Sequence, residues 1–401
     1  MLRFLFSFIV AGLFSYVAIA QDLVEFTLGS GYQYDIYYSL AEGVTAYPER
    51  TDWELSFSTN IYDGNIRINS GNGVTLYQVS DDIDDWNNIT NLPNSALQLR
   101  NSETEWQIGA FLINAEGGLN YGWGNYNVTN QIIEGSRIYI INYGSFSKKI
   151  KINSLINGEY NFTVANLDGT NEENIGINTL NYASKKFIYY SLVNNEIVDR
   201  EPLEWDIVFT KYEAEYVTLN GQTMPYIVTG GLSNNNKISQ YDGFIDFNPA
   251  FEDLDFSTDI NIIGYDWKEY SGQYTIVPDR AYYILSQDEQ SLFKLVFQSF
   301  SGGQSGNMSF LIEELDFNPS QITNYSTNTI SICPNPNNGS FKINYYGDNA
   351  ILNIQDMNGR LLYQAGGSIS NFEIKNLNNG LYIATIITND NIFAKQIIVH
   401  Q

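Results

Sequence analysis

Short runs of β-branched and aromatic residues recur along most of the chain, separated by clusters of Asn, Gly, Asp and Ser. The runs IYYSL at 36–40 and WELSF at 53–57 are typical of strands, and others alternate between apolar and polar positions. No window combines a sustained helical period with capping residues at both ends. The pattern therefore predicts an all-β protein.

One stretch of this pattern occurs twice. Residues 27–57 align without a gap to residues 179–209, at an offset of 152, with ten identities in 31 positions. In the first copy the identical residues are Thr27, Leu28, Ile36, Tyr37, Tyr38, Ser39, Leu40, Glu49, Trp53 and Phe57. Such self-similarity predicts a duplicated module.

The likeness between the copies continues with loops of different length. The matching residues are Trp123, Arg137, Tyr139 and Lys151 in the first copy and Trp267, Arg280, Tyr282 and Lys294 in the second. Each copy closes on a Gly-x-aromatic-or-Met-x-Phe pattern, through Gly158, Tyr160 and Phe162 or Gly306, Met308 and Phe310. We therefore predict two tandem homologous modules at 21–166 and 174–315, each a β-sandwich or barrel.

The first 20 residues have a short basic start, an apolar run and a small-x-small ending, which predicts a secretory signal peptide. Residues 316–329 are polar and aperiodic and are expected to form a linker. The single cysteine, Cys333, excludes an internal disulfide.

The last part of the chain, residues 330–401, carries three ordered signatures. These are PNPNNG at 334–339, NNGLY at 378–382 and a lysine, Lys395, close to the end. In this order they resemble the C-terminal sorting domain of type IX secretion substrates in Bacteroidota. The resemblance implies a small β-sandwich recognised by the type IX secretion machinery, and hence a secreted or cell-surface protein exported through the periplasm and across the outer membrane.

Charge and residue usage narrow the possible functions. The net charge of -25 repels nucleic acid and anionic lipid, so no nucleic-acid partner is expected. The only histidine is His400, which excludes Ser-His-Asp and Cys-His catalysis from the body of the chain and leaves no zinc site built on His or Cys. We expect a protein that is not an enzyme.

Carboxylates allow two further interpretations. The segment 166–174 and the acidic run 81–85 offer oxygen ligands for calcium, although both also read as solvated turns, which we favour. The sequence therefore does not decide whether the chain binds calcium. Two acids could also serve a glycosidase, and Glu54 and Asp206, which follow the duplicated Trp residues, are the candidates. Alternation along a strand instead predicts that they point to solvent, away from a core Trp.

The body of the second copy has its own family resemblance. The segments WDIVFTKY at 205–212, VTGGLSN at 228–234 and GYDWK at 264–268 resemble the HmuY-like family of haem-binding proteins, and WELSF at 53–57 extends the likeness more weakly to the first copy. The resemblance implies an all-β haemophore that takes haem from a haem-carrying protein and passes it to an outer-membrane receptor.

The haem ligands are where the chain departs from that family. A His pair is missing, and haem iron otherwise accepts Met, Cys or Tyr. Met224, in a predicted GQTMP loop at 221–225, is a candidate lid ligand, although we favour a gap-filling role for it. Met308 replaces Tyr160 of the repeat and is expected in the core. Tyr212 could supply a phenolate and Lys211 a cation for a propionate, but we favour an ordinary strand position for Tyr212.

Two functions follow from these observations. The first is a haem-binding surface protein without His ligands. The second is a non-haem binding or adhesion protein of the same fold, whose exposed aromatic side chains contact a glycan or a protein.

Overall fold

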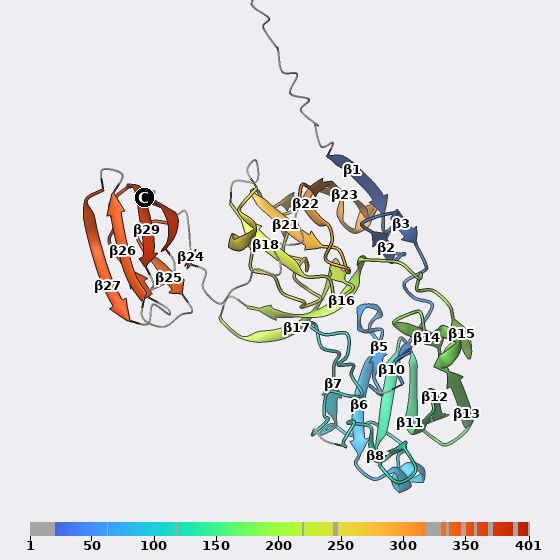
Figure 1. Ribbon diagram of the computed structural model, residues 1–401. Coiled ribbons are helices and arrows are strands. Elements are labelled where there is room, and N and C mark those ends of the chain that lie inside the picture. The colour runs from blue at the N-terminus through green and yellow to red at the C-terminus, as the bar shows by residue number, and fades with distance from the viewer. Residues whose placement is uncertain are drawn as a thin grey trace, which may run out of the picture.

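The computed structural model describes residues 21–399 apart from 62, 117–118, 219, 244–247, 318–329, 334–336, 346–349, 357–358, 368–371 and 388–391. The predicted signal peptide and most of the predicted linker lie outside the described residues. Within the described ranges the chain forms strands and short 3₁₀ helices but no α-helix (Figure 1), which confirms the all-β prediction. No helix in these ranges is long and apolar enough to cross a membrane.

The first structural module, defined as β4 to β15, contains two antiparallel sheets. The larger has the order β13-β12-β11-β10-β6-β7, with β9 paired to β11 and β8 to β9; the smaller has the order β15-β14-β4-β5. Their bounds are β4 Leu55–Ser58, β5 Ile66–Ile68, β6 Thr75–Ser80, β7 Leu97–Leu99, β8 Gly124–Asn127, β9 Ile132–Gly135, β10 Ile138–Tyr143, β11 Phe146–Ile156, β12 Glu159–Asn166, β13 Glu173–Asn178, β14 Phe187–Ser191 and β15 Glu196–Val198.

The second structural module contains β1 to β3 and β16 to β23. Its sheets have the orders β1-β23-β22-β21-β18 and β17-β16-β2-β3, beside a ribbon of β19 and β20. The bounds are β1 Asp22–Thr27, β2 Ile36–Ser39, β3 Gly43–Ala46, β16 Ile207–Val217, β17 Thr223–Ser233, β18 Ile238–Asp242, β19 Lys268–Tyr270, β20 Tyr274–Ile276, β21 Arg280–Leu285, β22 Leu292–Phe300 and β23 Asn307–Leu315. Five 3₁₀ helices join strands of the two modules, namely η1 Ser70–Asn72, η2 Ile83–Asn87, η3 Thr179–Tyr182, η4 Phe251–Asp253 and η5 Gly302–Gln304.

Each copy of the sequence repeat gives its first strands to the other module. Strand β2 of the first copy pairs with β16, aligning Tyr38 with Ile207, and β14 of the second copy pairs with β4, aligning Tyr190 with Leu55. In Figure 1 the blue strands β1 to β3 accordingly lie with the yellow and orange strands. The predicted boundaries 21–166 and 174–315 describe the sequence repeat. The structural modules do not follow these boundaries, because each contains strands from both copies.

The exchange places equivalent residues face to face between the modules. The hydroxyls of Tyr37 and Tyr189, one repeat apart, lie 3.3 Å from each other. Trp53 packs edge-on against Tyr189 at 4.9 Å between ring centroids, and Trp205 packs in the same way against Tyr37 at 5.2 Å. The duplicated aromatic residues thus form one of the contacts between the two modules.

Glu54 and Asp206 hold the turns of the exchanged segments. The Glu54 carboxylate accepts the backbone N–H of Leu192 at 2.6 Å, and Asp206 accepts that of Leu40, the equivalent residue, at 2.7 Å. Glu54 is only 1% exposed, so the expectation that both acids point to solvent is wrong for this residue. The reason is tertiary, because the exchanged strand covers the face that would otherwise be open. Burial raises the pKa of Glu54.

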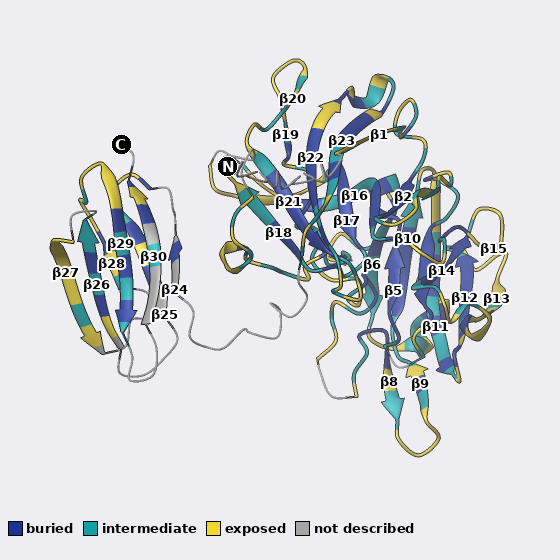
Figure 2. Ribbon diagram, turned by 45° about the horizontal axis from the view of Figure 1, so that its top comes forward, coloured by how far each residue is buried: buried dark blue, intermediate teal, exposed yellow. Residues whose placement is uncertain are grey.

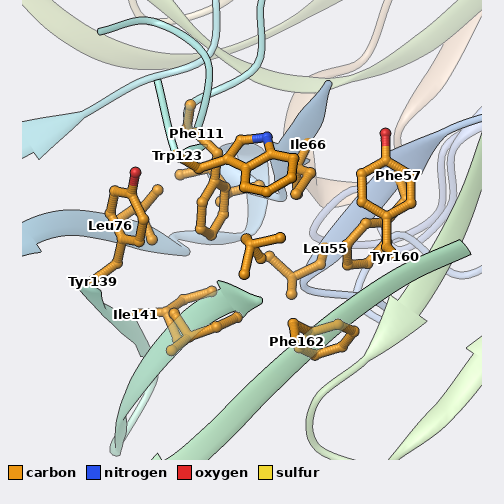
Figure 3. Close-up of a cluster of buried hydrophobic side chains, with 14 of the residues drawn as sticks. Leu55, Phe57, Ile66, Leu76, Phe111, Trp123, Tyr139, Ile141, Tyr160 and Phe162 are labelled. Atoms are coloured by element: carbon orange, nitrogen blue, oxygen red, sulfur yellow. The ribbon is translucent and has the colours of Figure 1, made fainter. Parts of the chain in front are cut away.

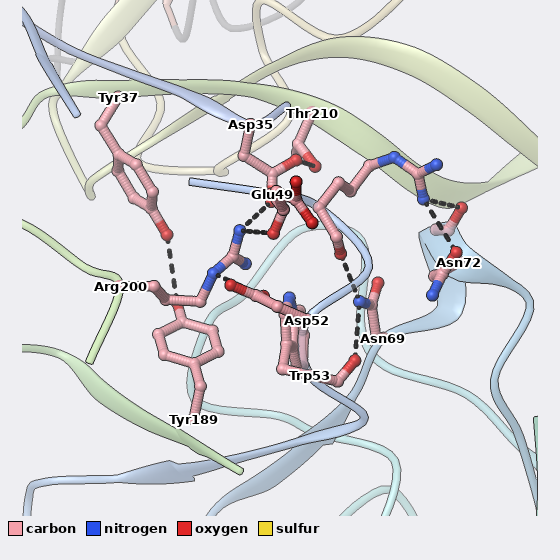
Figure 4. A network of polar contacts seen from close by, with 12 residues as sticks. Asp35, Tyr37, Glu49, Asp52, Trp53, Asn69, Asn72, Tyr189, Arg200 and Thr210 are labelled. Carbon is pink, nitrogen blue, oxygen red and sulfur yellow. Dashed lines mark hydrogen bonds and ion pairs between the residues drawn. The ribbon is translucent and has the colours of Figure 1, made fainter. Parts of the chain in front are cut away.

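The two segments that cross between modules enclose a buried ionic network (Figure 4). The Arg200 guanidinium lies 2.8 Å from Asp35 and 3.3 Å from Asp52, and it faces the Tyr189 ring. Thr210 of β16 donates to the second oxygen of Asp35 at 2.5 Å. A charge this deeply buried is tolerated because it is paired and hydrogen-bonded.

Each module has its own aromatic core. In the first, Trp123, Phe111 and Tyr139 lie over Leu55 and neighbouring aliphatic side chains (Figure 3). The second core contains Trp267 stacked on Phe297 at 3.7 Å, together with Met308 and Phe310. Met308 is 1% exposed, which confirms its prediction as a core residue. Figure 2 shows the buried positions concentrated along the strands of both modules.

Strand register corrects one match within the repeat. Tyr139 pairs with Ile150, whereas its counterpart Tyr282 pairs with Leu295. The residue equivalent to Lys294 is therefore Lys149, and not Lys151 as the sequence alignment predicts. Both of these lysines are buried.

The C-terminal domain is a small two-sheet sandwich, as expected, with sheet orders β24-β25-β28 and β27-β26-β29-β30. Its core includes Ile343, Leu352, Ile354 and Ile386. The ion pair of Lys395 with Asp253 connects it to the second module. The strands are β24 Ile330–Cys333, β25 Phe341–Tyr345, β26 Ala350–Asp356, β27 Leu361–Gly367, β28 Phe372–Ile374, β29 Gly380–Ile387 and β30 Ile392–Val399.

Candidate binding cleft

The β16–β17 hairpin forms the first wall of the cleft. Both strands have 11 residues and extend beyond the core (Figure 1). Directly paired residues of antiparallel strands share a face, so the pairing of Tyr216 with Met224 and of Ala214 with Tyr226 places these side chains on the face of Tyr212. At the end of the hairpin Tyr216, Met224 and Tyr226 are 42%, 47% and 58% exposed.

A loop at 255–266 forms the second wall. Backbone bonds in both directions join Gly231 to Gly264 and Ile238 to Ser257, and the Ser233 N–H donates to Ile260 at 2.8 Å. A Cβ on Gly230 would lie 2.0 Å from the Gly264 carbonyl oxygen, so only glycine allows this approach. The loop is therefore held firmly against β17 and β18.

A loop of the first module, residues 101–108, completes the cleft. Arg67 of β5 donates to four backbone carbonyls of this loop, those of Ser102, Glu105, Trp106 and Ile108, at 2.8 to 3.2 Å. Burial lowers the pKa of Arg67 to about 10. With no carboxylate among these partners, the guanidinium acts as a clamp for the loop backbone.

The same loop is joined to the second module at three points. The Trp106 indole N–H donates to the Ser233 carbonyl at 2.7 Å, and the Ile260 N–H donates to the Thr104 carbonyl at 2.9 Å. Glu103 accepts the backbone N–H of Glu215 at 3.0 Å. The first module therefore supplies Glu103 to a cleft whose other walls belong to the second.

The cleft has a volume of ≈ 460 Å³ and is open to solvent. Four acidic residues, two tyrosines, two amide residues and a serine line it, together with a glycine and one aliphatic residue. The polar lining residues are Glu103, Tyr212, Glu215, Gln240, Asp255, Ser257, Asn261, Tyr265 and Asp266. Such a surface can accept and donate hydrogen bonds and offers two aromatic rings.

Tyr212 is the most deeply buried of these polar side chains, with 7% of its surface exposed. Its hydroxyl makes no hydrogen bond to any residue that the structure describes, although Gly264 and the cleft lie beside it. Burial, reinforced by the negative charge of Glu103, raises its pKa well above the usual value, so the phenol is neutral. The hydroxyl borders the open cleft, where water or a bound molecule can form its hydrogen bond.

The predicted site residues are only partly brought together. Tyr212 and Met224 share a face of the hairpin, four residue positions apart along β16, which is roughly 14 Å at 3.4 Å per residue. Lys211 lies on the opposite face, where its ammonium is 5.9 Å from the Tyr32 ring, and burial lowers its pKa. Whether these residues bind haem stays a prediction.

Met224 lies in strand β17 and not in a loop. Gly221 and Pro225 led to the prediction of a loop, but the turn closes at Thr218 and Gln222. Pro225 is tolerated in the strand because β17 is at a free sheet edge there. The glutamates and aspartates of the cleft were missed, because nothing in their local sequence shows that three distant segments converge.

The proposed calcium segments have other partners. In the acidic run, Asp81 pairs with Arg137, and Asp82 accepts the N–H of Asp84. In the segment 166–174, Asp168 accepts bonds from Thr170. Across the described ranges no group of three or more His, Cys, Asp or Glu side chains is placed to hold a metal ion.

A second, smaller cavity of ≈ 80 Å³ lies at the module junction. Arg67, Arg200, Trp53 and Tyr189 line it, and Tyr212 separates it from the cleft. Two of its charged side chains, Asp35 and Arg200, are paired within the network of Figure 4. It has room for a few water-sized molecules only.

Comparison with solved structures finds five matching chains, among them two distant likenesses. One is to PorZ, described as an essential bacterial surface component of the type IX secretion system of Porphyromonas gingivalis, with 10% identity and a TM-score of 0.17, covering 71% of this chain and 39% of that one. The other is to a polysaccharide lyase, with 9% identity and a TM-score of 0.17, covering 92% and 47%. The chain spans less than half of either structure, and at these TM-scores neither likeness bears on function.

No curated protein matches the chain. Residues 331–400 match the family described as the secretion system C-terminal sorting domain, in close agreement with the predicted range 330–401. The sandwich built on β24 to β30 is the structural form of this match. The chain therefore carries a type IX secretion sorting domain and is exported to the cell surface or released from it.

Proposed function

We propose that the exported chain is a binding protein, without catalytic activity, that holds a glycan in the cleft between the β16–β17 hairpin and the loop at 255–266. The observation that carries the proposal is the Tyr212 hydroxyl, which borders the open cleft and makes no hydrogen bond to a described residue, among acidic and amide residues. A sugar hydroxyl supplies the missing hydrogen bond.

The aromatic side chains support a glycan. Tyr265 lies in the cleft, and Tyr216 and Tyr226 continue from it along the exposed end of the hairpin, with 5.9 Å between their ring centroids. Tyr rings present flat apolar faces and a polar edge, which suits a sugar ring with its hydroxyls. An added peptide strand is disfavoured, because Pro225 removes an N–H from the free edge of β17.

Binding of the whole chain to an array of immobilised oligosaccharides tests the proposal, followed by calorimetric titration of the best ligand. Tyr212→Phe removes only the hydroxyl and should weaken binding by about 0.5–1.5 kcal/mol, the net value of one hydrogen bond. Tyr139→Phe is the matched control, because its buried hydroxyl also lacks a partner but lies in the first core. Equal affinity of the two variants would contradict the proposed site.

Haem binding is the second candidate, favoured by the shared hairpin face of Tyr212 and Met224. A neutral phenol and the opposite orientation of Lys211 weigh against ligation by Tyr212 with a propionate contact to Lys211. Hemin titration of the whole chain tests it. A shifted Soret band that changes in Met224→Ala would support haem binding, with a haem-carrying protein and an outer-membrane receptor as its partners, and no shift would remove it.

A further inference from the structure

We infer that a pocket beside the β10–β11 turn of the first module binds a free α-amino acid with a short apolar side chain. The pocket has a volume of ≈ 90 Å³ and shares no lining residue with the proposed glycan cleft. The inference therefore goes beyond the proposed function and does not depend on it. The residues that line the pocket are Glu54, Ile141, Tyr143, Phe146, Lys148, Leu192 and Val193.

One wall of the pocket is the β10–β11 hairpin of the larger sheet. The pairing of Ile141 with Lys148 and of Tyr143 with Phe146 places these four side chains on one face of the hairpin. Ile141 is buried in the first core, whereas Phe146 is 53% exposed. The pocket thus leads from the edge of the core to the surface.

The other wall is the turn after β14, which is held by Glu54, the residue directly before β4. The carboxylate oxygen Oε2 accepts the backbone N–H groups of Leu192 at 2.6 Å and of Val193 at 3.3 Å. The second oxygen, Oε1, has no hydrogen-bond partner among the described residues, although only 1% of Glu54 is exposed. Oε1 is not fully enclosed, and because all three residues line the pocket, this oxygen faces it. A buried carboxylate oxygen with one open side favours a ligand that donates an N–H.

The second module shows the same position with both oxygens satisfied. Asp206, the equivalent of Glu54, uses its second oxygen to accept the side-chain amide of Asn236 at 2.9 Å. In the first module the connection from β5 to β6 is longer than that from β17 to β18 and forms η1. Its Asn72 amide donates to the Tyr143 hydroxyl instead, at 3.0 Å. The second oxygen of Glu54 is thereby left for another partner.

Lys148 is a further difference between the modules. Strand register makes Phe293 its equivalent, because Phe293 pairs with Ile284 as Lys148 pairs with Ile141. Phe293 packs against the second core, whereas the ammonium of Lys148 forms no ion pair or hydrogen bond with a described residue. The pocket therefore combines a carboxylate and an ammonium group that do not pair with each other, beside apolar side chains.

These groups match the two ends and the body of an α-amino acid. Its ammonium group can donate to Oε1 of Glu54, and its carboxylate can pair with Lys148. Its side chain can then lie against Ile141 and Leu192. The volume of ≈ 90 Å³ is smaller than the roughly 150 Å³ of a cavity that holds benzene, which limits the side chain to a few carbon atoms.

Three small molecules test the inference in calorimetric titrations of the whole chain. Valine carries both charged groups, isobutylamine is valine without its carboxylate, and isovalerate is valine without its ammonium group. We expect valine to bind about tenfold more tightly than either analogue, because each analogue loses one charge-assisted hydrogen bond. Undetectable binding of valine, or an analogue that binds as tightly as valine, overturns the inference.

Substitutions in the pocket assign each end of the ligand. Lys148→Met should reduce the affinity for valine to that for isobutylamine, and Glu54→Gln should reduce it to that for isovalerate. Lys151→Met is the matched control, because Lys151 is on the same strand but has its ammonium 5.0 Å from the Trp86 ring, outside the pocket. It should keep the full preference for valine.

Thermal melting followed by circular dichroism establishes that each variant is folded. If Glu54→Gln does not fold, Lys148→Met by itself decides the outcome, because unchanged discrimination between valine and isobutylamine in that variant overturns the inference. Oligosaccharide binding uses the other site and should be the same in Lys148→Met and Lys151→Met as in the unmodified chain. Failure of the amino-acid pocket and failure of the glycan cleft are thus separate results.

Discussion

The two modules share a scaffold but differ in one hairpin. In the first module the hairpin after the duplicated Trp is short, with four residues in β4 and three in β5. In the second module the corresponding strands β16 and β17 have 11 residues each. Both hairpins start from the same core position, Leu55 or Ile207. The difference shows that the repeat supplies the support, whereas the extension supplies a wall for the cleft.

The modules also depend on each other in unequal ways. The first lends Glu103 and Trp106 to the second, through a loop clamped by Arg67. The second copy of the repeat supplies β14 and β15 to a sheet of the first module. One contribution builds the candidate site and the other builds a core, so separating the modules should affect them differently.

The largest effect on stability is expected when two different fragments of the chain are compared. A fragment of residues 47–200 contains every strand of the first module, whereas a fragment of residues 21–166 lacks β14 and its buried Ile188 and Tyr190. Burying each large apolar side chain is worth about 1.5–3 kcal/mol. We expect cooperative thermal unfolding, followed by circular dichroism, from the first fragment only. A cooperative transition from residues 21–166 alone would show that the exchange is dispensable.

A smaller but still large effect is expected at the crossing segments. Arg200→Met leaves Asp35 buried without its cation and should lower the free energy of unfolding by about 3–5 kcal/mol. Arg280→Met breaks exposed pairs and should cost about 0–1 kcal/mol. Urea titration measures both. Similar losses would mean that the buried network does not hold the modules together.

The hairpin end should matter for binding and not for stability. Tyr216→Ser combined with Tyr226→Ser changes two exposed side chains, so the free energy of unfolding should change by less than about 1 kcal/mol in total. Oligosaccharide affinity should fall about tenfold if these rings extend the cleft. If this double variant binds the oligosaccharide with unchanged affinity, the site is confined to the cleft itself.

The smallest effect concerns pH. Burial raises the pKa of Glu54 in the folded state, so the folded protein binds a proton more readily than the unfolded chain does. Stability should therefore fall as pH rises from the ordinary glutamate pKa through the raised one. Glu54→Gln should flatten this decline in melting temperature. An identical slope in the variant would indicate that backbone N–H groups offset the burial fully.

The sequence by itself determined the fold class, the duplication and the sorting domain. Alternation and turn residues act locally, as in the runs at 36–40 and 53–57, and the sorting signatures are contiguous motifs. Met308 was also assigned to the core from its place in the repeat.

Only the tertiary structure decided which module each strand joins and where the cleft lies. Because Tyr38 and Tyr190 are the same residue of the repeat, either could complete either sheet on local grounds, and the path of the crossing segments makes the choice. The cleft likewise depends on Glu103, Tyr212 and Asp255 meeting from distant segments. Local patterns record how a segment folds, whereas long-range packing sets what it meets.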